Sequence, residues 1–531
     1  MKEKKIKTPL DRPFGKRDKI GYMMGDFGCN MSFQLISSFL MLFVTQGLGI
    51  DVEKHWPIIV IIAKIFDAIN DPIIGGLVDA RKPGRRGKYI PWIFCGAFAI
   101  ALTTVLLFID VRAISYWGRF AYVLVMYCVW SVAYTAANVP YGSLNAALTD
   151  DPGQRASLSS LRSIGAGVAM LPMMVIVPEL IYGEADPVTK IQPILPEVFV
   201  WVALVCGVVA IGGFMLTCFL TKERKQVEKP KEKFNYIQTL KSFVTNRAAL
   251  GMCLASFSQL VFVMSYAITL PLVCQLFFGD AKASGKVGIV MMLPMMFVIP
   301  FMGKLTKKFG KKEISMWPNL VAIAVLVIML IIPFPRTSAG MWAYAACLGV
   351  AMLASAPLNL GTWSMVADCV DEQEVKTAKK DGKNLYATYL TKEQFGKRDE
   401  ASVYATYSLA RKVAQGIGAA LVAFLAGLVG YDSKNVLATT PQTSQNLLTL
   451  SIVLPLVGSI LIFVAFFCVY NLSKKKVIEN TEFLRDKNAR IAIQLAKGAQ
   501  PDDGTDEAEV IVFDNVTEEV STETEPVPAQ A

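Results

Sequence analysis

Residues 58–88 read IIVIIAKIFDAINDPIIGGLVDARKPGRRGK. The stretch begins as an apolar run, and a run of about 20 such residues is long enough to cross a bilayer. Lys64, Asp67 and Asp71 lie inside the run, and a loop with five Lys or Arg residues follows it. Charged groups in such a helix are costly when they face lipid, so they must face a protein interior or an aqueous cavity. The stretch therefore predicts a membrane-spanning helix with a polar inner face.

The rest of the chain also has the composition of a polytopic membrane protein. Of its 531 residues, 53% are hydrophobic and only 18% are charged, whereas soluble domains carry about a quarter charged residues. The single His excludes most histidine-based catalysis and histidine metal sites. The ten Cys residues never approach C-x-x-C spacing, which argues against a zinc ribbon, a thioredoxin-type motif and a secreted disulfide framework. We therefore expect no enzymatic activity.

Twelve segments have the length and apolar character of a membrane span. They are residues 20–46, 56–78, 90–109, 118–144, 163–183, 197–220, 248–278, 285–303, 315–334, 341–366, 403–430 and 447–471. The sequence thus predicts an all-α membrane protein with twelve transmembrane helices.

The basic residues alternate between the connections. Eight precede Ile20, five follow the second span, eight lie in 221–247, five follow the eighth span and seven lie in 367–401. The intervening connections hold one or two each. This is the positive-inside pattern, and it predicts a multi-pass protein of the cytoplasmic membrane with both termini in the cytoplasm. We interpret the net charge of +10 as a topology signal, with the lipid bilayer and not nucleic acid as the partner.

The 221–247 segment divides the spans into six and six. We predict an N-terminal six-helix half at 1–220, a cytoplasmic linker at 221–247, a C-terminal six-helix half at 248–471 and a cytoplasmic tail at 472–531. A weak internal repeat supports this division, because GGLVDARKPGRR at 75–86 is similar to GKLTKKFGKK at 303–312. Residues 501–531 hold ten acidic residues and no Lys or Arg, so we expect the end of the tail to be disordered.

Four polar groups of the second span share one helical face, namely Lys64, Asp67, Asn70 and Asp71. Two carboxylates a turn apart repel each other unless a cation or a proton sits between them. Together with the Asn70 amide oxygen they form a set of hard oxygen ligands, which suits Na⁺ better than a soft metal. The cluster predicts a site for a small cation. The alternative is that internal ion pairs merely lock helices together.

Other predicted spans carry polar and aromatic groups as well. The fourth span has Tyr134, Thr135 and Asn138, with core packing as the alternative for the tyrosine. The eleventh has Arg411 and Lys412, which would complement the carboxylates of the first half across a central cavity. Snorkelling of these two side chains to the cytoplasmic surface is the alternative.

Four motifs, in this order, resemble the glycoside–pentoside–hexuronide:cation symporter family, the melibiose-permease-like branch of the major facilitator superfamily. They are DAINDP at 67–72, GKYIPW at 87–92, NVPYGSL at 138–144 and WSMVAD at 363–368. The resemblance extends from about Gly21 to Leu472. It implies the major facilitator fold of two six-helix halves. It also implies a monomeric secondary transporter that couples Na⁺ or H⁺ inflow to sugar uptake, with no cofactor beyond the coupling ion.

The resemblance also assigns residues to roles. The expected cation site is Asp67, Asn70, Asp71 and Thr135. The resemblance places Asp26, Arg162 (following the fourth span), Lys412 and Asn138 in the substrate site, and we add Tyr134 and Trp363 because their rings lie within predicted spans. We expect supporting or gating roles for Lys64, Asp79 and Arg85, and for Arg411 as a basic group beside Lys412.

The chain departs from the melibiose permease at two sugar-site positions. The permease has an aspartate where this chain has Asn138, and a tryptophan where it has Gly142. A bidentate carboxylate contact thereby becomes a weaker amide contact, which argues against melibiose itself as the cargo. Two alternatives stay open, a non-sugar cargo such as a lysolipid on the same scaffold and a membrane sensor that does not transport.

Overall fold

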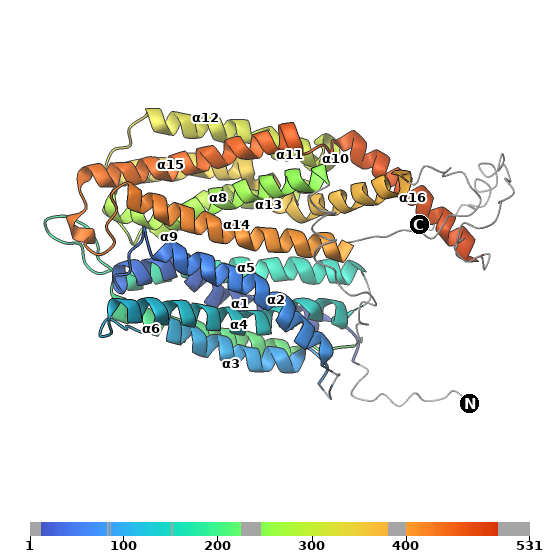
Figure 1. The fold of residues 1–531 in the computed structure, drawn as a ribbon, viewed down its shortest axis with the longest axis horizontal. Helices are drawn as coiled ribbons and strands as arrows, with labels where there is room; N and C mark the ends of the chain where they lie inside the picture. The colour runs from blue at the N-terminus through green and yellow to red at the C-terminus, as the bar shows by residue number, and fades with distance from the viewer. Residues whose placement is uncertain are drawn as a thin grey trace, which may run out of the picture.

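Long helices run side by side along the whole molecule (Figure 1). The computed structural model describes residues 12–81, 84, 86–149, 152–224, 246–380 and 400–496. Within these ranges the regular secondary structure is helical, and β-pairing is limited to two isolated bridges, Gly84 with Gly87 and Tyr182 with Ile194. The predicted all-α fold is confirmed.

The first half contains six long helices. They are α1 (Lys16–Leu42, continued by the π-helical turn η2, Phe43–Gly47), α2 (Trp56–Ala80), α3 (Ile90–Leu107), α4 (Tyr116–Leu148), α5 (Pro152–Ile181) and α6 (Pro196–Leu220). Local sequence sets several of the boundaries. Helices α2, α3 and α6 have a proline in the first turn, where its missing N–H costs nothing. The Ser115 side chain caps α4 by accepting a hydrogen bond from the Gly118 N–H.

The second half also consists of long helices, but two of its spans are divided into shorter helical segments. Its helices are α8 (Arg247–Leu276), α9 (Ser284–Val298), η3 (Ile299–Phe301), α10 (Met302–Phe309), α11 (Lys311–Met316), α12 (Pro318–Ile331), α13 (Ser338–Lys380), α14 (Glu400–Leu428), η4 (Val436–Ala438), α15 (Pro441–Val464) and η5 (Ala465–Val469), followed by α16 (Lys474–Ala496). The predicted eighth span is α9, η3 and α10 in succession. The ninth is α11 and α12, which separate at Trp317 because Pro318 has no backbone N–H to donate.

Eleven helical segments of the described chain are long and apolar enough to cross a membrane. The twelfth is α2, which has 25 residues but carries the charged cluster. Its apolar side chains lie on the outside, as Ile65 and Ile69 are 51% and 59% exposed, whereas Asn70 is buried. The charged helix is therefore turned with its polar face inward, as the spacing predicts.

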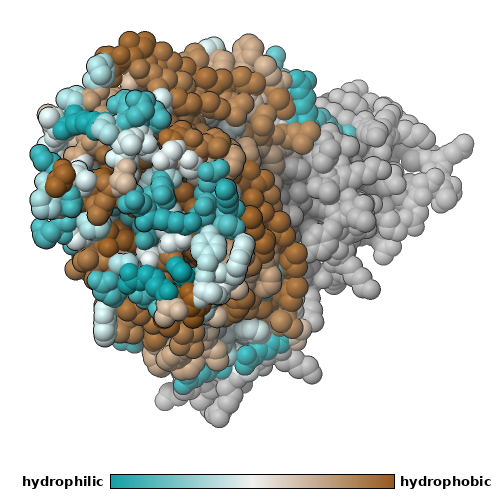
Figure 2. All heavy atoms as spheres, turned by 60° about the vertical axis from the view of Figure 1, so that its left-hand side comes forward, coloured by the Kyte–Doolittle hydropathy of each residue, from teal (hydrophilic) through white to brown (hydrophobic). Residues whose placement is uncertain are grey.

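The two halves lie one above the other in Figure 1, with α1–α6 below and α8–α15 above. Helix α16 lies at the right of that view, and we call this side of the bundle the terminal end. The connections 48–55, 182–195, 277–283 and 429–440 lie at the opposite end, which we call the loop end. Figure 2 shows polar residues gathered at the loop end and apolar residues covering the adjoining side of the bundle. This is the surface that a membrane protein presents to lipid and water.

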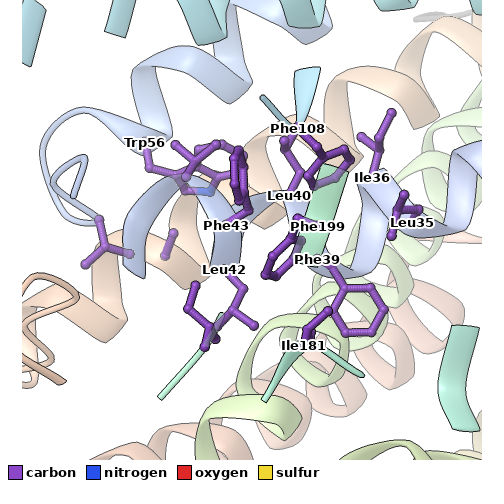
Figure 3. Packing of buried hydrophobic residues seen from close by; sticks show 14 of the residues in the cluster. Leu35, Ile36, Phe39, Leu40, Leu42, Phe43, Trp56, Phe108, Ile181 and Phe199 are labelled. Carbon is purple, nitrogen blue, oxygen red and sulfur yellow. The ribbon is translucent and has the colours of Figure 1, made fainter. Parts of the chain in front are cut away.

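The largest apolar core lies toward the loop end and joins the two halves. Figure 3 shows part of it, with Phe43, Phe108 and Phe199 packed together. Leu276 and Tyr431 of the second half belong to the same cluster. Toward the terminal end each half has a separate core. Apolar packing between the halves is therefore concentrated toward one end of the bundle.

Two boundaries differ from the sequence prediction. Helix α13 continues to Lys380, so residues 367–380 of the expected connection 367–401 are helical. A helix of 43 residues is about 64 Å long, about twice the thickness of a bilayer core, and its end packs against α16. Nearly buried pairs join the two helices, with Lys487 3.0 Å from Glu374 and Asn480 2.8 Å from Glu372. These long-range contacts stabilise helical structure where the polar sequence indicated a loop.

The second difference concerns α5, which begins at Pro152 rather than near residue 163. Arg162 was expected in the connection after the fourth span. It instead lies ten residues inside α5, about 15 Å from the beginning of the helix. Because the residues before Arg162 are polar, a search for apolar runs did not detect this part of the helix.

Candidate functional site

A cavity of about 330 Å³ lies between the two halves. Its lining comes from α1, α2 and α4 of the first half and from α14 of the second. The polar lining residues are Lys64, Asp67, Asp71, Tyr127, Ser131, Tyr134, Thr135, Asn138, Lys412 and Gln415. Three of the four predicted cation-site residues, Asp67, Asp71 and Thr135, thus lie around one cavity with part of the predicted sugar site, whereas Asn70 does not line it.

The carboxylates of α2 bind hydroxyls of α4 on one side and an ammonium of α14 on the other. Ser131 donates a hydrogen bond to Asp67 (2.6 Å), and Thr135 donates one to Asp71 (2.9 Å). The Lys412 ammonium pairs with Asp71 and lies 3.4 Å from Asp67. Lys412 therefore supplies a positive charge between two carboxylates that would otherwise repel each other.

Lys64 and Asn70 complete the polar face of α2. The stem of Lys64 packs on α14 at Gly416, where an added Cβ would lie 2.8 Å from the Lys64 Cβ. Asn70 is buried, and its amide nitrogen has no hydrogen-bond partner among the described residues. An unpaired buried polar atom is costly, so the Asn70 amide is available to a ligand or to a rearrangement of the site.

A second polar group is centred on Asp26 of α1 and Arg162 of α5. The Arg162 Nε donates to an Asp26 carboxylate oxygen over 3.0 Å, and Asn30 donates to the other oxygen over 2.9 Å. Arg162 also donates to the Asn138 side-chain oxygen over 3.3 Å, and its guanidinium lies 5.3 Å from the Tyr141 ring centroid. Asp26, Arg162 and Asn138 thus connect α1, α5 and α4 as neighbouring elements of one site.

Aromatic side chains form one wall of the cavity. Tyr134 stacks on Trp130 with ring centroids 5.1 Å apart, and Phe33 lies 5.4 Å from Tyr134. The Trp130 indole donates to the Ser32 hydroxyl, which holds the ring in place. Trp130 belongs to the buried apolar core and also lines the cavity. Such a wall offers an apolar surface to a sugar ring.

Trp363 lies apart from this wall, on α13. Its side chain is 47% exposed, and it contacts the Tyr407 ring edge-to-face. The Arg411 guanidinium lies 5.6 Å from the Trp363 ring centroid, within range of a cation–π contact. The second half therefore presents its own basic and aromatic group.

Some of the predicted site residues are not tested by this geometry. Arg85 and the side chain of Asp79 lie outside the described residues. Other contacts were missed by the sequence analysis, notably those of Ser131 with Asp67 and of Asn30 with Asp26. Ser131 precedes Thr135 by one helical turn, so both hydroxyls face α2. That spacing was a usable signal, whereas the partners of Lys412 depend on how the halves pack.

The comparisons with known proteins agree with this architecture. Residues 21–396 and 390–474 match the family described as MFS/sugar transport protein. The uncharacterized symporter YjmB of Bacillus subtilis (strain 168) is 27% identical over 491 residues, covering 92% of this chain and 98% of the relative. A putative sulfoquinovose importer of Escherichia coli (strain K12) is 26% identical, covering 92% and 97%. The glucuronide carrier protein homolog of E. coli K12 is 24% identical, covering 88% and 95%.

Solved structures show the same fold. The nucleoside transporter NupG has a TM-score of 0.55 at 12% identity, covering 86% of this chain and all of that chain. A bacterial homolog of the human lysosomal transporter Spinster, in an inward-facing and occupied conformation, has a TM-score of 0.56 at 12% identity, covering 90% and 98%. The predicted major facilitator fold is thereby confirmed. With the family match over nearly the whole membrane portion, this chain belongs to the MFS/sugar transport protein family and is a multi-pass membrane transporter, not an enzyme.

Proposed function

We propose that this protein is a symporter that couples inflow of Na⁺ or H⁺ to uptake of a glycoside or related sugar. The observation that carries the proposal is the position of Lys412. This residue of the second half pairs with Asp71 and lies 3.4 Å from Asp67, both on the first half. A charge pair that bridges the moving halves is the element that a coupling ion can make or break.

The coupling ion would compete with Lys412 for the same carboxylates. An ammonium and a carboxylate about 4 Å apart attract by about 4 kcal/mol at an effective dielectric constant near 20. A Na⁺ held by Asp67, Asp71, Thr135 and Asn70, or a proton on one carboxylate, would remove that attraction. Lys412 would then be released from α2 and become available to the cargo, so binding of the ion and binding of the cargo would favour each other.

The cargo would bind beside the ion. Asp26, Arg162 and Asn138 offer hydrogen-bonding groups for sugar hydroxyls, and the Trp130–Tyr134 pair offers an aromatic face for the ring. Thr135 and Asn138 are three residues apart on α4, so they lie on the same side of that helix. A small displacement of α4 by the ion would therefore move the Asn138 side chain of the sugar site, which links the two sites mechanically.

Transport would follow from rocking of the halves about this site. In the conformation described, Gln46 with Gln275, Lys286 with Glu179 and Lys434 with Asp51 join the halves at the loop end, and Lys412 joins them at the middle. Under the positive-inside prediction the terminal end is cytoplasmic, so we assign this conformation as inward-facing. The names of the relatives, a symporter, an importer of sulfoquinovose and a homolog of a glucuronide carrier, support symport of a sugar.

Uptake by purified protein in proteoliposomes tests the proposal. We expect a panel of glycosides and pentosides to include one that accumulates under an inward Na⁺ or H⁺ gradient and is lost when that gradient is dissipated. Asp71→Asn should reduce gradient-driven accumulation by about 100-fold or more, because the neutral amide removes a charge that both Lys412 and the coupling ion would bind. Asp110→Asn is the control, because Asp110 pairs with Arg112 at the loop end and should transport normally.

Two results would contradict the proposal. Accumulation by Asp71→Asn with unchanged ion dependence would remove the carboxylate from the coupling mechanism. Absence of both accumulation and counterflow for every sugar, from protein shown to be folded, would favour a non-sugar cargo or a membrane sensor.

A further inference from the structure

We propose that this protein has a second binding site, which holds an anionic phospholipid from the membrane leaflet at the terminal end. Helices α10 and α11 lie toward that end of the second half (Figure 1). Together with α13 they line a pocket of about 430 Å³ that is separate from the central cavity. The inference depends on neither the cargo nor the coupling ion.

The pocket lies on the outer side of α13. Gly361 and Met365 line it, whereas Trp363 is two residues from each of them and therefore lies on the opposite side of the helix. Trp363 contacts residues of α14. Beside the pocket, the side chains of Phe301 and Trp317 are 54% and 53% exposed, as is typical of residues that contact lipid. The pocket therefore opens toward the bilayer.

The pocket extends from the hydrocarbon core of the membrane to the headgroup layer. Pro357 and Ser364 both line it, and they lie 19 and 26 residues after Ser338, where α13 begins at the loop end. At 1.5 Å per residue these positions are about 28 and 39 Å along the helix. The hydrocarbon core is about 30 Å thick, and the bilayer with its headgroups is about 40–45 Å thick. Pro357 therefore lies in the core and Ser364 among the headgroups.

The part of the pocket in the hydrocarbon core is apolar and open. Met302 of α10, Ile314 of α11 and Leu360 of α13 line it. Two glycines leave the space free, because a Cβ at Gly303 would meet no atom within 4 Å and one at Gly361 would meet only the Met302 Cε, at 3.9 Å. Covering such a surface with a hydrocarbon chain is favourable.

The part of the pocket at headgroup level is basic. Lys307 and Lys311 line it, within a segment, 304–313, that contains five Lys and one Glu. Lys311 pairs with Asp368 over 2.7 Å. Lys307 has no ion-pair partner among the described residues. An ammonium without a counter-charge is therefore available to an anion at this level.

The combination of the two parts identifies the ligand. Basic pockets between membrane helices on the cytoplasmic side bind anionic lipid headgroups, and the positive-inside pattern predicts that the terminal end is cytoplasmic. Inorganic phosphate would contact the lysines but leave the apolar part empty. A zwitterionic lipid would fill the apolar part but bring its own positive charge to Lys307. An anionic phospholipid such as phosphatidylglycerol satisfies both parts at once.

A lipid in this pocket would stabilise a part of the second half where two spans are interrupted. The eighth span is divided at η3, which contains Pro300, and the ninth at Pro318. One lipid in contact with α10, α11 and α13 would hold the short segments against the long helix. We therefore expect phosphatidylglycerol to raise the melting temperature of the protein, as any ligand of the folded state does.

The first experiment locates the lipid by photolabelling. The full-length protein is placed in nanodiscs of phosphatidylethanolamine with a small fraction of phosphatidylglycerol that carries a diazirine on one acyl chain. We expect mass spectrometry of the peptides to find labels within 302–315 and 357–365. A photoactivatable phosphatidylcholine should label them about fivefold less or weaker still, and excess inorganic phosphate should not reduce the labelling.

Lys307→Gln tests the charge. It should lower labelling of the pocket by phosphatidylglycerol about fivefold, the contribution of one lysine near an anionic lipid surface. Lys475→Gln is the matched control, because it removes a lysine of α16 whose side chain is 89% exposed and does not line the pocket. Labelling should be unchanged in that control.

Gly361→Leu tests the shape and keeps every charge. The added side chain should occupy the apolar part, so both the labelling of the pocket and the stabilisation by phosphatidylglycerol should be lost. Gly303→Leu serves the same purpose from α10 if Gly361→Leu fails to fold. Gly212→Leu on α6 is the matched control, because a Cβ there also meets no atom within 4 Å.

Three results would overturn the inference. Equal labelling by phosphatidylglycerol and phosphatidylcholine would remove the role of the lysines. Displacement of the label by inorganic phosphate would assign the basic part to a free anion. Unchanged labelling in the folded glycine variants would show that lipid gathers at a charged surface without entering the pocket.

Discussion

The loop end and the terminal end of the bundle hold the two halves together in different ways. At the loop end, α5 packs against α9 so closely that a Cβ at Gly285 would collide with the backbone of Met174. Gln275, fully buried, donates to the Gln192 backbone oxygen over 2.7 Å and accepts from Gln46 over 2.9 Å. Toward the terminal end each half has its own apolar core. The comparison shows that one end is a closed interface, whereas toward the other the apolar cores of the two halves are separate.

This difference has a physical consequence for the transport cycle. The closed end is held by apolar packing, neutral hydrogen bonds and a few exposed ion pairs, all of which can be broken without burying a charge. The middle is held by Lys412 and two carboxylates, whose attraction responds to an ion. The contacts at the loop end therefore stabilise the conformation described here in the absence of ligand. The charged groups at the middle make the change of conformation depend on the ion.

The largest effect on uptake is expected from a covalent cross-link that prevents the loop end from opening. The Lys286 ammonium lies 2.8 Å from Glu179 across the two halves. In a variant lacking the native cysteines, Glu179→Cys together with Lys286→Cys and a short bifunctional thiol reagent should abolish uptake, because rocking requires these helices to separate. Reversal of the cross-link by a reductant should restore uptake, which is measured in proteoliposomes.

The control for this experiment uses two residues of the second half. Lys311 and Asp368 lie 2.7 Å apart within that half, so cross-linking Lys311→Cys to Asp368→Cys should leave rocking intact. Undiminished uptake by the protein cross-linked between α5 and α9 would show that the loop end need not open.

A smaller effect is expected from weakening the glutamine contacts. Gln275→Met keeps the volume but removes the donor to the Gln192 backbone oxygen and the acceptor of one Gln46 N–H, while Gln46 still donates to the Tyr431 hydroxyl. Each unpaired buried group costs about 1–3 kcal/mol, so the loop end should open about 5- to 150-fold more often. Ser433 is buried at the loop end, so Ser433→Cys places a thiol that is reached when this end opens. The measurement is the rate at which a membrane-impermeant maleimide labels that thiol.

Gln442→Met should leave that labelling rate unchanged, because this exposed amide bonds to Asn446 within α15. Equal rates in Gln275→Met and the unaltered protein would mean that apolar packing alone closes the loop end.

The smallest effect is expected at the rim of the loop end. The Lys434 ammonium lies 3.8 Å from Asp51, and the two side chains are 49% and 28% exposed. Exposed ion pairs contribute about 0–1 kcal/mol, so Lys434→Ala should change the same labelling rate by less than about fivefold. That change should shrink further as salt is raised. If Lys434→Ala changed the labelling rate as much as Gln275→Met does, this ion pair would contribute more to closing the loop end than its exposure predicts.

Much of the architecture could be predicted from local sequence patterns. Apolar length predicts the spans, and the three- and four-residue spacing on α2 predicts a polar face, because both depend only on the geometry of a single helix. The same reasoning failed for the end of α13 and the beginning of α5. Those segments are polar, and their helical structure is stabilised by contacts such as Lys487 with Glu374 and Arg162 with Asp26.

The sequence by itself determined that this is a twelve-span membrane protein, which side of α2 is polar, and which residue types are available for ion and sugar binding. Only the tertiary structure decided which charges meet. Lys412 and Asp71 are 341 residues apart in the chain, and no local spacing can predict that pair. Side-chain periodicity specifies the face of a helix, but the neighbour of that face depends on the packing of two halves that fold from separate parts of the chain.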